Sequence, residues 1–427
     1  MERIMRWPYL LTVFLLAYMP FHVFLSQWLS TYSGQLDTWK IWKDILLFGG
    51  ILLVSGLVYI KRSFKDRLFW IFFVFSALYF TLHILVWKFT DVPDKTALLA
   101  TAYNCRLLGY AILGWGTAIV SNKHFTAKKI FTIVIIISSV VCILGILQYS
   151  LPKDILTHFG YSLDRGVRPA FFIDNKPDLP RIMSTLRDPN SLGAYLVLPI
   201  VILVGGWLKK PKMRMMFTGL LVLHVLALLL TFSRSALAGA IIGSIVILVW
   251  HYQEKTKTIV KKHWPLLATG IAILFALGFA MRNQYFVQNV IFHSDENTKM
   301  TDSNNLHVQF AEKGVRGIAD RPLGHGPGTA GLVSIHTKNV VLTENYFIQI
   351  GYEVGILGLA LLIGMMAFIC RLLYIHNDFY SWTLLSGFVG ITLCSLLLLT
   401  WSNEAVACQW WLLAGLVAGM RGKHKKA

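Results

Sequence analysis

The chain has 427 residues, of which 56% are hydrophobic and only 14% are charged. Its mean hydropathy of +0.59 excludes an ordinary soluble domain and indicates a protein that lies mostly within a membrane. The formal net charge of +19 does not indicate nucleic-acid binding, because no basic domain stands outside the apolar segments.

Apolar segments long enough to cross a hydrocarbon layer, about 20 residues each, recur along the whole chain. We predict an all-α polytopic membrane protein, a single membrane domain over residues 1–427 with about twelve transmembrane helices. The helices are predicted to begin near Trp7, Asp44, Leu68, Leu98, Ile130, Ser191, Met215, Ala236, Trp264, Tyr352, Ser381 and Ala405. The first segment lacks a small-residue cleavage site and further spans follow it, so a retained helix fits better than a signal peptide.

Lys and Arg residues gather in alternate connections between these segments. The clusters lie at 61–67, 123–129, 209–214, 255–262 and 421–426, whereas the short connections on the other side carry few basic residues. Cytoplasmic loops are enriched in Lys and Arg. We therefore expect a protein of the plasma or inner membrane with both termini in the cytoplasm.

Two connections are long, at about 151–189 and about 282–343, and this topology places both of them outside the cytoplasm. Long loops in a compact protein usually carry function or are disordered. The second loop is expected to hold short amphipathic helices, one of them at about Asn305–Asp320. It also contains a glycine-rich stretch at 322–331 that is typical of a structured turn.

Unusual polar residues gather on this same outer side. The block R-I-M-S-T-L-R-D-P-N ends at Asn190, where Asn190 or Ser191 is expected to cap the sixth span. Arg181 begins this block and is either a ligand or an arginine that snorkels to the membrane surface. The block T-F-S-R-S-A places Arg234 in a short outer turn, against the positive-inside bias. Arg234 is therefore either an anion ligand or a surface anchor.

A third block leads through the glycine-rich stretch to Glu344 and Asn345, where the tenth span begins. Glu344 is either a reacting carboxylate or a charge that stabilises a helix N-terminus. Deeper in the spans, an isolated charge is costly, so we expect Arg106 and Glu353 to form a structural pair. The histidines of the apolar spans, His83 and His224, are expected to be hydrogen-bonded core residues.

The five cysteines lie in or beside apolar segments and show no C-x-x-C spacing, which favours packing over a disulfide framework or a zinc site.

Together, the polar blocks resemble the O-antigen ligase and O-antigen polymerase family of integral-membrane glycosyltransferases. The resemblance covers about residues 180–360 and rests on R-x-x-S-T-x-x-x-P-N-x-x-G-A, S-R-S-A, P-L-G-x-G-P-G and N-x-x-x-Q-x-x-x-E-x-G-I-L-G. It implies a GT-C-like fold with its large outer loop between spans 9 and 10. It also implies transfer of a glycan from a polyprenyl-diphosphate donor to an acceptor hydroxyl on the outer face, with inversion and without a metal or other cofactor. The acceptor is a glycan, a lipid or a protein, and membrane lipid is the remaining expected partner.

The resemblance also implies roles for individual residues. Catalytic roles fall to Glu344, Arg234 and His307, and substrate-binding roles to Arg181, Asn190, Arg316, Asn345, His325 and His336. Many family members carry a histidine in the place of Glu344, so His325 and His336 are alternative bases here. Many also carry an arginine in the place of His307, so Arg316 is the alternative donor ligand. Nine residues apart on one helix, His307 and Arg316 face opposite sides, and only one of them can address the donor.

Three alternatives stay open. A polymerase shares the fold and the donor with a ligase and differs only in its acceptor. A twelve-span transporter predicts inverted repeats and broken helices near the membrane midplane, and a flippase for the same lipid predicts a basic, water-filled central cavity.

Overall fold

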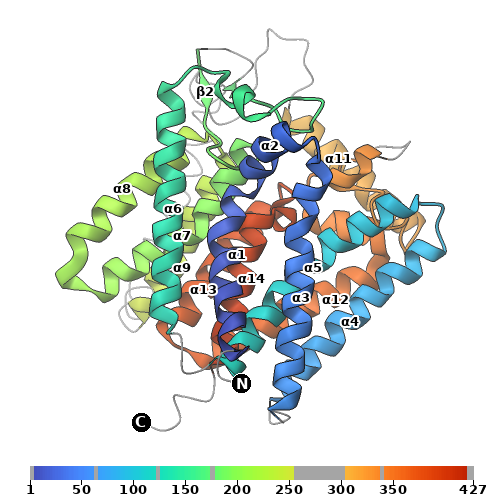
Figure 1. Ribbon diagram of the computed structural model, residues 1–427, viewed down its shortest axis with the longest axis horizontal. Coiled ribbons are helices and arrows are strands. Elements are labelled where there is room, and N and C mark those ends of the chain that lie inside the picture. Colours follow the sequence, from blue (N-terminus) through green and yellow to red (C-terminus); the bar gives the residue numbers. More distant parts are fainter. Residues whose placement is uncertain are drawn as a thin grey trace, which may run out of the picture.

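The computed structural model describes residues 4–61, 66–121, 126–173, 178–253, 303–336 and 341–420, and most of these residues are helical (Figure 1). The α-helices are α1 Trp7–Tyr18, α2 His22–Ser33, α3 Leu36–Ile60, α4 Arg67–Lys88, α5 Asp94–Val120, α6 Ala127–Ser150, α7 Pro189–Lys209, α8 Arg214–Leu230, α9 Arg234–His251, α11 Ser303–Asp320, α12 Tyr346–His376, α13 Phe379–Ser395 and α14 Glu404–Gly419. The strands of one antiparallel hairpin are β1 Phe171–Phe172 and β2 Pro180–Arg181.

The predicted all-α membrane fold is confirmed. Each predicted span corresponds to a helix, except the span near Trp264, which lies outside the described residues. The first span comprises α1 and α2, which a short 3-10 turn at Met19–Phe21 separates. Pro20 lacks the N–H that a continuous α-helix would need there. Within the described residues, eight helical segments are long and apolar enough to cross a membrane.

The centre of the bundle is formed by α5 and α14, which pack against each other along most of their length. A Cβ atom built on Gly114 would lie 2.2 Å from Leu412 O, and one built on Gly415 would lie 2.1 Å from Ala111 O. Only glycine permits so close an approach of two helix backbones. The interior place of α5 also explains its modest hydropathy, because its Thr, Asn and Gly side chains face protein rather than lipid.

The start of α1 and the end of α14 lie at the same end of the bundle (Figure 1). Near this end, Ser121 Oγ donates to Met5 O, and Lys61 Nζ donates to Val120 O at 2.7 Å. The last residue of α14, Gly419, packs against Trp115 and Ala118. At the opposite end lie the N-termini of α7, α9 and α12, and these carry the polar blocks identified in the sequence.

The glycine-rich stretch inserts its backbone into a break in α12. Gly355 has non-helical angles, with φ of 76°. Around it, His325 N donates to Tyr352 O at 2.9 Å, and Ile356 N donates to Pro322 O at 2.9 Å. These bonds satisfy backbone groups that the break would otherwise leave unpaired within the membrane. The short helix predicted before this stretch is confirmed as α11.

The two histidines of the apolar spans are hydrogen-bonded in the core, as predicted. His83 Nδ1 lies 2.9 Å from Tyr79 O, and His224 Nε2 lies 2.8 Å from Ser138 Oγ.

Candidate active site

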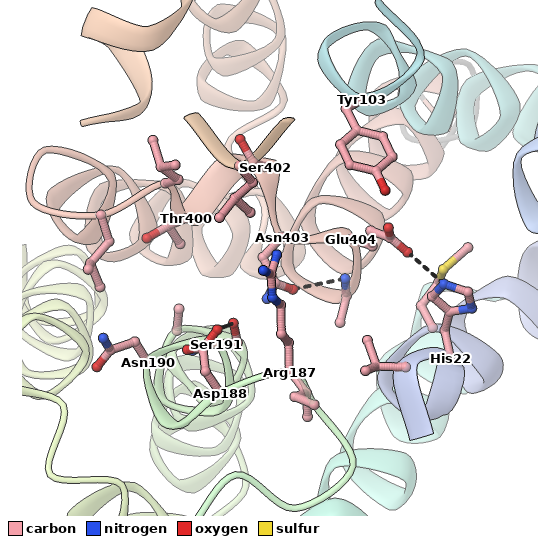
Figure 2. Close-up of a pocket in the computed structure, with 18 of the residues that line it drawn as sticks. His22, Tyr103, Arg187, Asp188, Asn190, Ser191, Thr400, Ser402, Asn403 and Glu404 are labelled. Atoms are coloured by element: carbon pink, nitrogen blue, oxygen red, sulfur yellow. Dashed lines mark hydrogen bonds and ion pairs between the residues drawn. The ribbon is translucent and has the colours of Figure 1, made fainter. Parts of the chain in front are cut away.

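A cavity of about 400 Å³ lies between α2, α5, α7 and α14, and the segment that precedes α12 closes one side of it (Figure 2). A concave pocket with a few convergent polar groups is the first candidate for a reaction site. Its polar lining consists of His22, Tyr103, Arg106, Arg187, Asp188, Asn190, Ser191, Glu344, Thr400, Ser402, Asn403 and Glu404. Asn190 and Glu344, which belong to different sequence blocks, therefore share one cavity.

Arg181 joins the first two polar blocks beside this cavity. Its Nε donates to Thr231 O at 2.8 Å, and its Nη2 donates to Asn190 Oδ1 at 2.9 Å. The hairpin strand β2 is thereby fastened to the turn between α8 and α9, which also carries Arg234. Burial lowers the pKa of Arg181 from its ordinary value, the carboxylate of Asp188 raises this pKa, and the charge of Arg234 lowers it. Two guanidinium groups whose positive charges act on each other favour an anionic ligand.

The cap of α7 differs from the prediction. The helix begins at Pro189, and Asp188 caps it, with Ser191 N donating to Asp188 Oδ1 and Ser191 Oγ donating to Asp188 Oδ2, each at 2.8 Å. Proline suits this first position because the N–H group that it lacks would have no acceptor within the helix there. The Asn190 side chain is consequently not needed as a cap and instead holds Arg181.

Glu344 reaches the cavity wall from the segment before α12. Asn345 caps the helix, because its Oδ1 accepts from Phe347 N at 2.9 Å and from Ile348 N at 3.1 Å. Its Nδ2 donates to Leu396 O at 2.8 Å and so ties the start of α12 to the segment before α14. The cap of α12 is therefore Asn345, and Glu344 lines the cavity.

Backbone strain marks the same region. Of the four described non-glycine residues with positive φ, three lie in the three polar blocks: Ser184 at 53°, Phe232 at 51° and Glu344 at 45°. Such angles cost free energy and cluster at functional sites. These strained angles therefore fall in the three blocks that the sequence analysis singled out.

Arg316 and His325 do not lie in this cavity. Both line a separate groove of about 440 Å³ between α11 and α12. The His325 ring stacks on Tyr352 with centroids 4.1 Å apart, and Arg316 pairs with Glu312 at the exposed surface of α11. His307 lies on α11 and His336 on the 3-10 helix Gly331–His336, but their side chains lie outside the described part of the chain. Their roles stay predictions.

The predicted pair between Arg106 and Glu353 is wrong. Arg106 Nη1 donates to Glu404 Oε1 at 2.8 Å, while Glu353 Oε2 accepts from Asn104 Nδ2 at 2.7 Å and Glu353 Oε1 accepts from Ala330 N at 3.3 Å. Two residues apart on α5, Asn104 and Arg106 point in directions about 200° apart. Arg106 therefore faces α14 and the cavity, whereas Asn104 faces α12.

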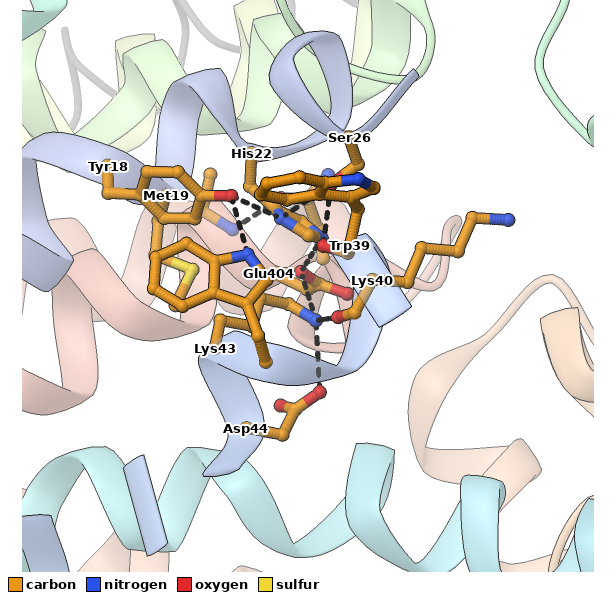
Figure 3. Close-up of polar contacts among 12 residues, drawn as sticks. Tyr18, Met19, His22, Ser26, Trp39, Lys40, Lys43, Asp44 and Glu404 are labelled. Atoms are coloured by element: carbon orange, nitrogen blue, oxygen red, sulfur yellow. Dashed lines mark hydrogen bonds and ion pairs between the residues drawn. The ribbon is translucent and has the colours of Figure 1, made fainter. Parts of the chain in front are cut away.

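Glu404 belongs to an ionic cluster at one wall of the cavity. His22, Lys43 and Asp44 lie around it (Figure 3), and Arg106 donates to its carboxylate. Lys43 Nζ lies 3.2 Å from Glu404 Oε2 and 3.0 Å from Asp44 Oδ2, and His22 Nε2 lies 3.3 Å from Glu404 Oε2. Lys43 is only 1% exposed. Taking charges out of water costs several kcal/mol per ion, so these groups must compensate one another. The cluster fixes the orientation of the Glu404 carboxylate at the cavity.

Sequence reasoning did not find this cluster. No motif contains Lys43, Asp44 or Glu404, and the signal in the sequence was only their position in or beside apolar segments, where charged residues are usually functional. Arg187 was also not selected, although it lies within the first polar block. In the structure its side chain extends across the cavity towards Asn403 (Figure 2).

Comparisons with known proteins agree with the polar blocks. A family profile described as O-antigen ligase matches residues 219–363, which include Arg234 and Glu344. An O-antigen polymerase of Salmonella muenchen is 21% identical over 362 residues, which cover 82% of this chain and 84% of that protein. These matches support the O-antigen ligase and polymerase family. With its apolar helices, the chain is a multi-pass membrane protein that is similar to the O-antigen ligases and polymerases.

Proposed function

We propose that this protein is a membrane glycosyltransferase that transfers a glycan from a polyprenyl-diphosphate donor to an acceptor hydroxyl. The observation that carries the proposal is that residues of the first and third polar blocks line one cavity, while Arg181 ties the second block to the first beside it. Arg181 and Arg234 supply adjacent positive charges beside Asn190, and Glu344 supplies a carboxylate on the wall of the same cavity. An anion site next to a carboxylate suits the departure of a diphosphate from a sugar.

In the proposed reaction, the acceptor oxygen attacks the anomeric carbon from the face opposite the diphosphate, which inverts the configuration. The acceptor proton passes to the Glu344 carboxylate as the new carbon–oxygen bond forms. The bond between the anomeric carbon and the phosphate oxygen breaks, and its electron pair leaves with the diphosphate. The guanidinium groups of Arg181 and Arg234 stabilise the negative charge that grows on this leaving group, so no metal or other cofactor is needed for that role.

We further propose that the cavity faces the extracytoplasmic side of a plasma or inner membrane. The basic clusters at 61–67, 123–129 and 209–214 adjoin helix ends remote from the N-termini of α7, α9 and α12. By the positive-inside rule these clusters mark the cytoplasmic side. The donor then lies in the outer leaflet, with its diphosphate at the level of the arginines.

The family leaves two reactions open, because the matching profile is named for a ligase and the Salmonella muenchen relative for a polymerase. We favour a ligase, whose acceptor is a separate glycan, lipid or protein, over a polymerase, which extends a growing chain. A transporter or flippase of lipid-linked glycans is the rival of a different class. It would move the donor between leaflets without breaking the bond to phosphate.

The test uses the purified full chain in proteoliposomes with a defined polyprenyl-diphosphate-linked glycan and a set of candidate acceptors. Release of polyprenyl diphosphate together with a new glycosidic bond supports the enzyme, and the acceptor that is used separates a ligase from a polymerase. Movement of intact glycan lipid between leaflets, with no new bond for any acceptor, would refute the proposal and support transport.

A further inference from the structure

Arg187 differs from the other arginines at the cavity. Arg181 is held by Asn190 and Thr231 O, and Arg106 is held by Glu404 and Ser402 O. Within the part of the chain that the structure describes, the Arg187 guanidinium has neither a hydrogen-bond nor an ion-pair partner, although the residue is half-buried and lines the cavity. A guanidinium carries five N–H donors in a fixed fork. An arginine left with no protein partner inside a cavity is available to a ligand.

The surroundings of Arg187 favour an anion. Burial lowers the pKa of Lys40, Asp37 raises it, and the positive charges of Arg187 and Arg165 lower it. Arg187 also points towards the N-terminal end of α14, which carries the positive end of the helix dipole (Figure 2). These positive charges repel one another unless a negative group lies among them.

The neighbouring carboxylates have other partners. Asp37 pairs with Lys95 at 3.6 Å, Asp188 accepts both of its hydrogen bonds from Ser191, and Glu404 is held by Arg106, Lys43 and His22. Among the described residues, none of these carboxylates forms an ion pair with the Arg187 guanidinium. The positive charge of Arg187 is therefore one that a ligand can pair.

We propose that Arg187 forms a second phosphate-binding subsite, separate from the pair of Arg181 and Arg234. The inference rests on the proposed function and refines it, since it divides the site into two anion positions reached from different elements. Arg181 and Arg234 lie on β2 and α9, whereas Arg187 precedes α7 and lines the cavity. The phosphate at Arg187 is either the second phosphate of the donor or a phosphate carried by the acceptor.

The experiment measures binding by calorimetry on the purified full chain in detergent, with farnesyl diphosphate, farnesyl monophosphate and inorganic phosphate as probes. The variants are Arg187→Gln and Arg187→Lys. The control is Arg214→Gln, which removes a guanidinium that stacks on Trp207 near the other end of α7. Because Arg187 has no protein partner, its substitution should leave the melting temperature unchanged.

If the subsite takes the donor's second phosphate, Arg187→Gln should raise the Kd for farnesyl diphosphate about 10- to 100-fold, as expected for a lost charged donor, and leave the monophosphate unaffected. Arg187→Lys should fall between this variant and the wild type, because it keeps the charge but loses the fork. If the subsite takes an acceptor phosphate, farnesyl diphosphate should bind with the same affinity to the wild type and to Arg187→Gln. After saturation with farnesyl diphosphate, the wild type should still bind inorganic phosphate, whereas Arg187→Gln should not.

Equal affinity of Arg187→Gln and wild type for every probe would overturn the subsite. If Arg234→Ala no longer binds farnesyl diphosphate in the same calorimetric measurements, the proposed function stands without the subsite. If the wild type binds no farnesyl diphosphate at all, both proposals fail together.

Discussion

The Arg181 guanidinium donates to Asn190 Oδ1 at 2.9 Å, and this bond joins a hairpin strand to the first turn of a membrane helix. The same guanidinium holds Thr231 O at 2.8 Å in the turn that carries Arg234. One side chain thus connects two sequence blocks that lie 50 residues apart.

Arg181→Lys tests this connection. Lysine keeps the charge but cannot donate to Asn190 and Thr231 O in the same fork geometry, so glycan transfer should fall about 10- to 100-fold. The measurement is the rate of polyprenyl diphosphate release in proteoliposomes. Arg168→Lys, at an exposed position of the same connection between α6 and α7, is the matched control and should keep the wild-type rate. Equal rates for both variants would show that the fork geometry of Arg181 is not used.

Arg234→Ala should lower transfer by about 10²–10³, the effect of losing one good charge-stabilising donor, while the protein still inserts into the membrane. The rate of glycosidic bond formation measures the first effect, and the yield of folded protein on size-exclusion chromatography measures the second. Arg214→Ala is the control for the loss of an arginine as such. Near-normal transfer by Arg234→Ala would remove this residue from the site.

Glu344→Gln keeps the shape of the side chain but cannot accept the acceptor proton. We expect transfer to fall by about 10²–10⁴, the usual contribution of a general base, while the affinity for farnesyl diphosphate stays within about twofold of the wild type. The two measurements are turnover across a range of pH and calorimetric binding. A turnover and pH profile identical to the wild type would transfer the role of base to a histidine.

Lys43→Met should destabilise the protein by about 3–5 kcal/mol, because it leaves the buried carboxylates of Asp44 and Glu404 with too little positive charge. The double variant Lys43→Met/Asp44→Leu removes one charge of each sign and leaves Glu404 with Arg106. It should therefore unfold at a higher temperature than the single variant. Thermal unfolding in detergent is the measurement, and a double variant less stable than Lys43→Met would contradict the proposed charge balance.

The membrane fold could be predicted from the sequence because the length of the apolar segments and the Lys and Arg residues in the connections between them are strong local signals. The three polar blocks were also visible, and the residues that line or adjoin the cavity include Arg181, Asn190 and Glu344. The partners of the charged residues were not predictable. Arg106 and Glu353 both lie within apolar segments, and they fail to pair because their side chains point in different directions from their helices. Arg106 reaches Glu404 across 298 residues of sequence, and no local pattern encodes such a contact.

The depth of Arg106 has a consequence for the substrates. It lies twelve residues from the start of α5, which corresponds to about 18 Å along the helix axis, yet it lines the cavity. There its guanidinium donates to Glu404 Oε1 and to Ser402 O. Under the proposed function, a substrate that enters meets this part of the wall already ordered, because the arginine is held in place by groups of the protein itself.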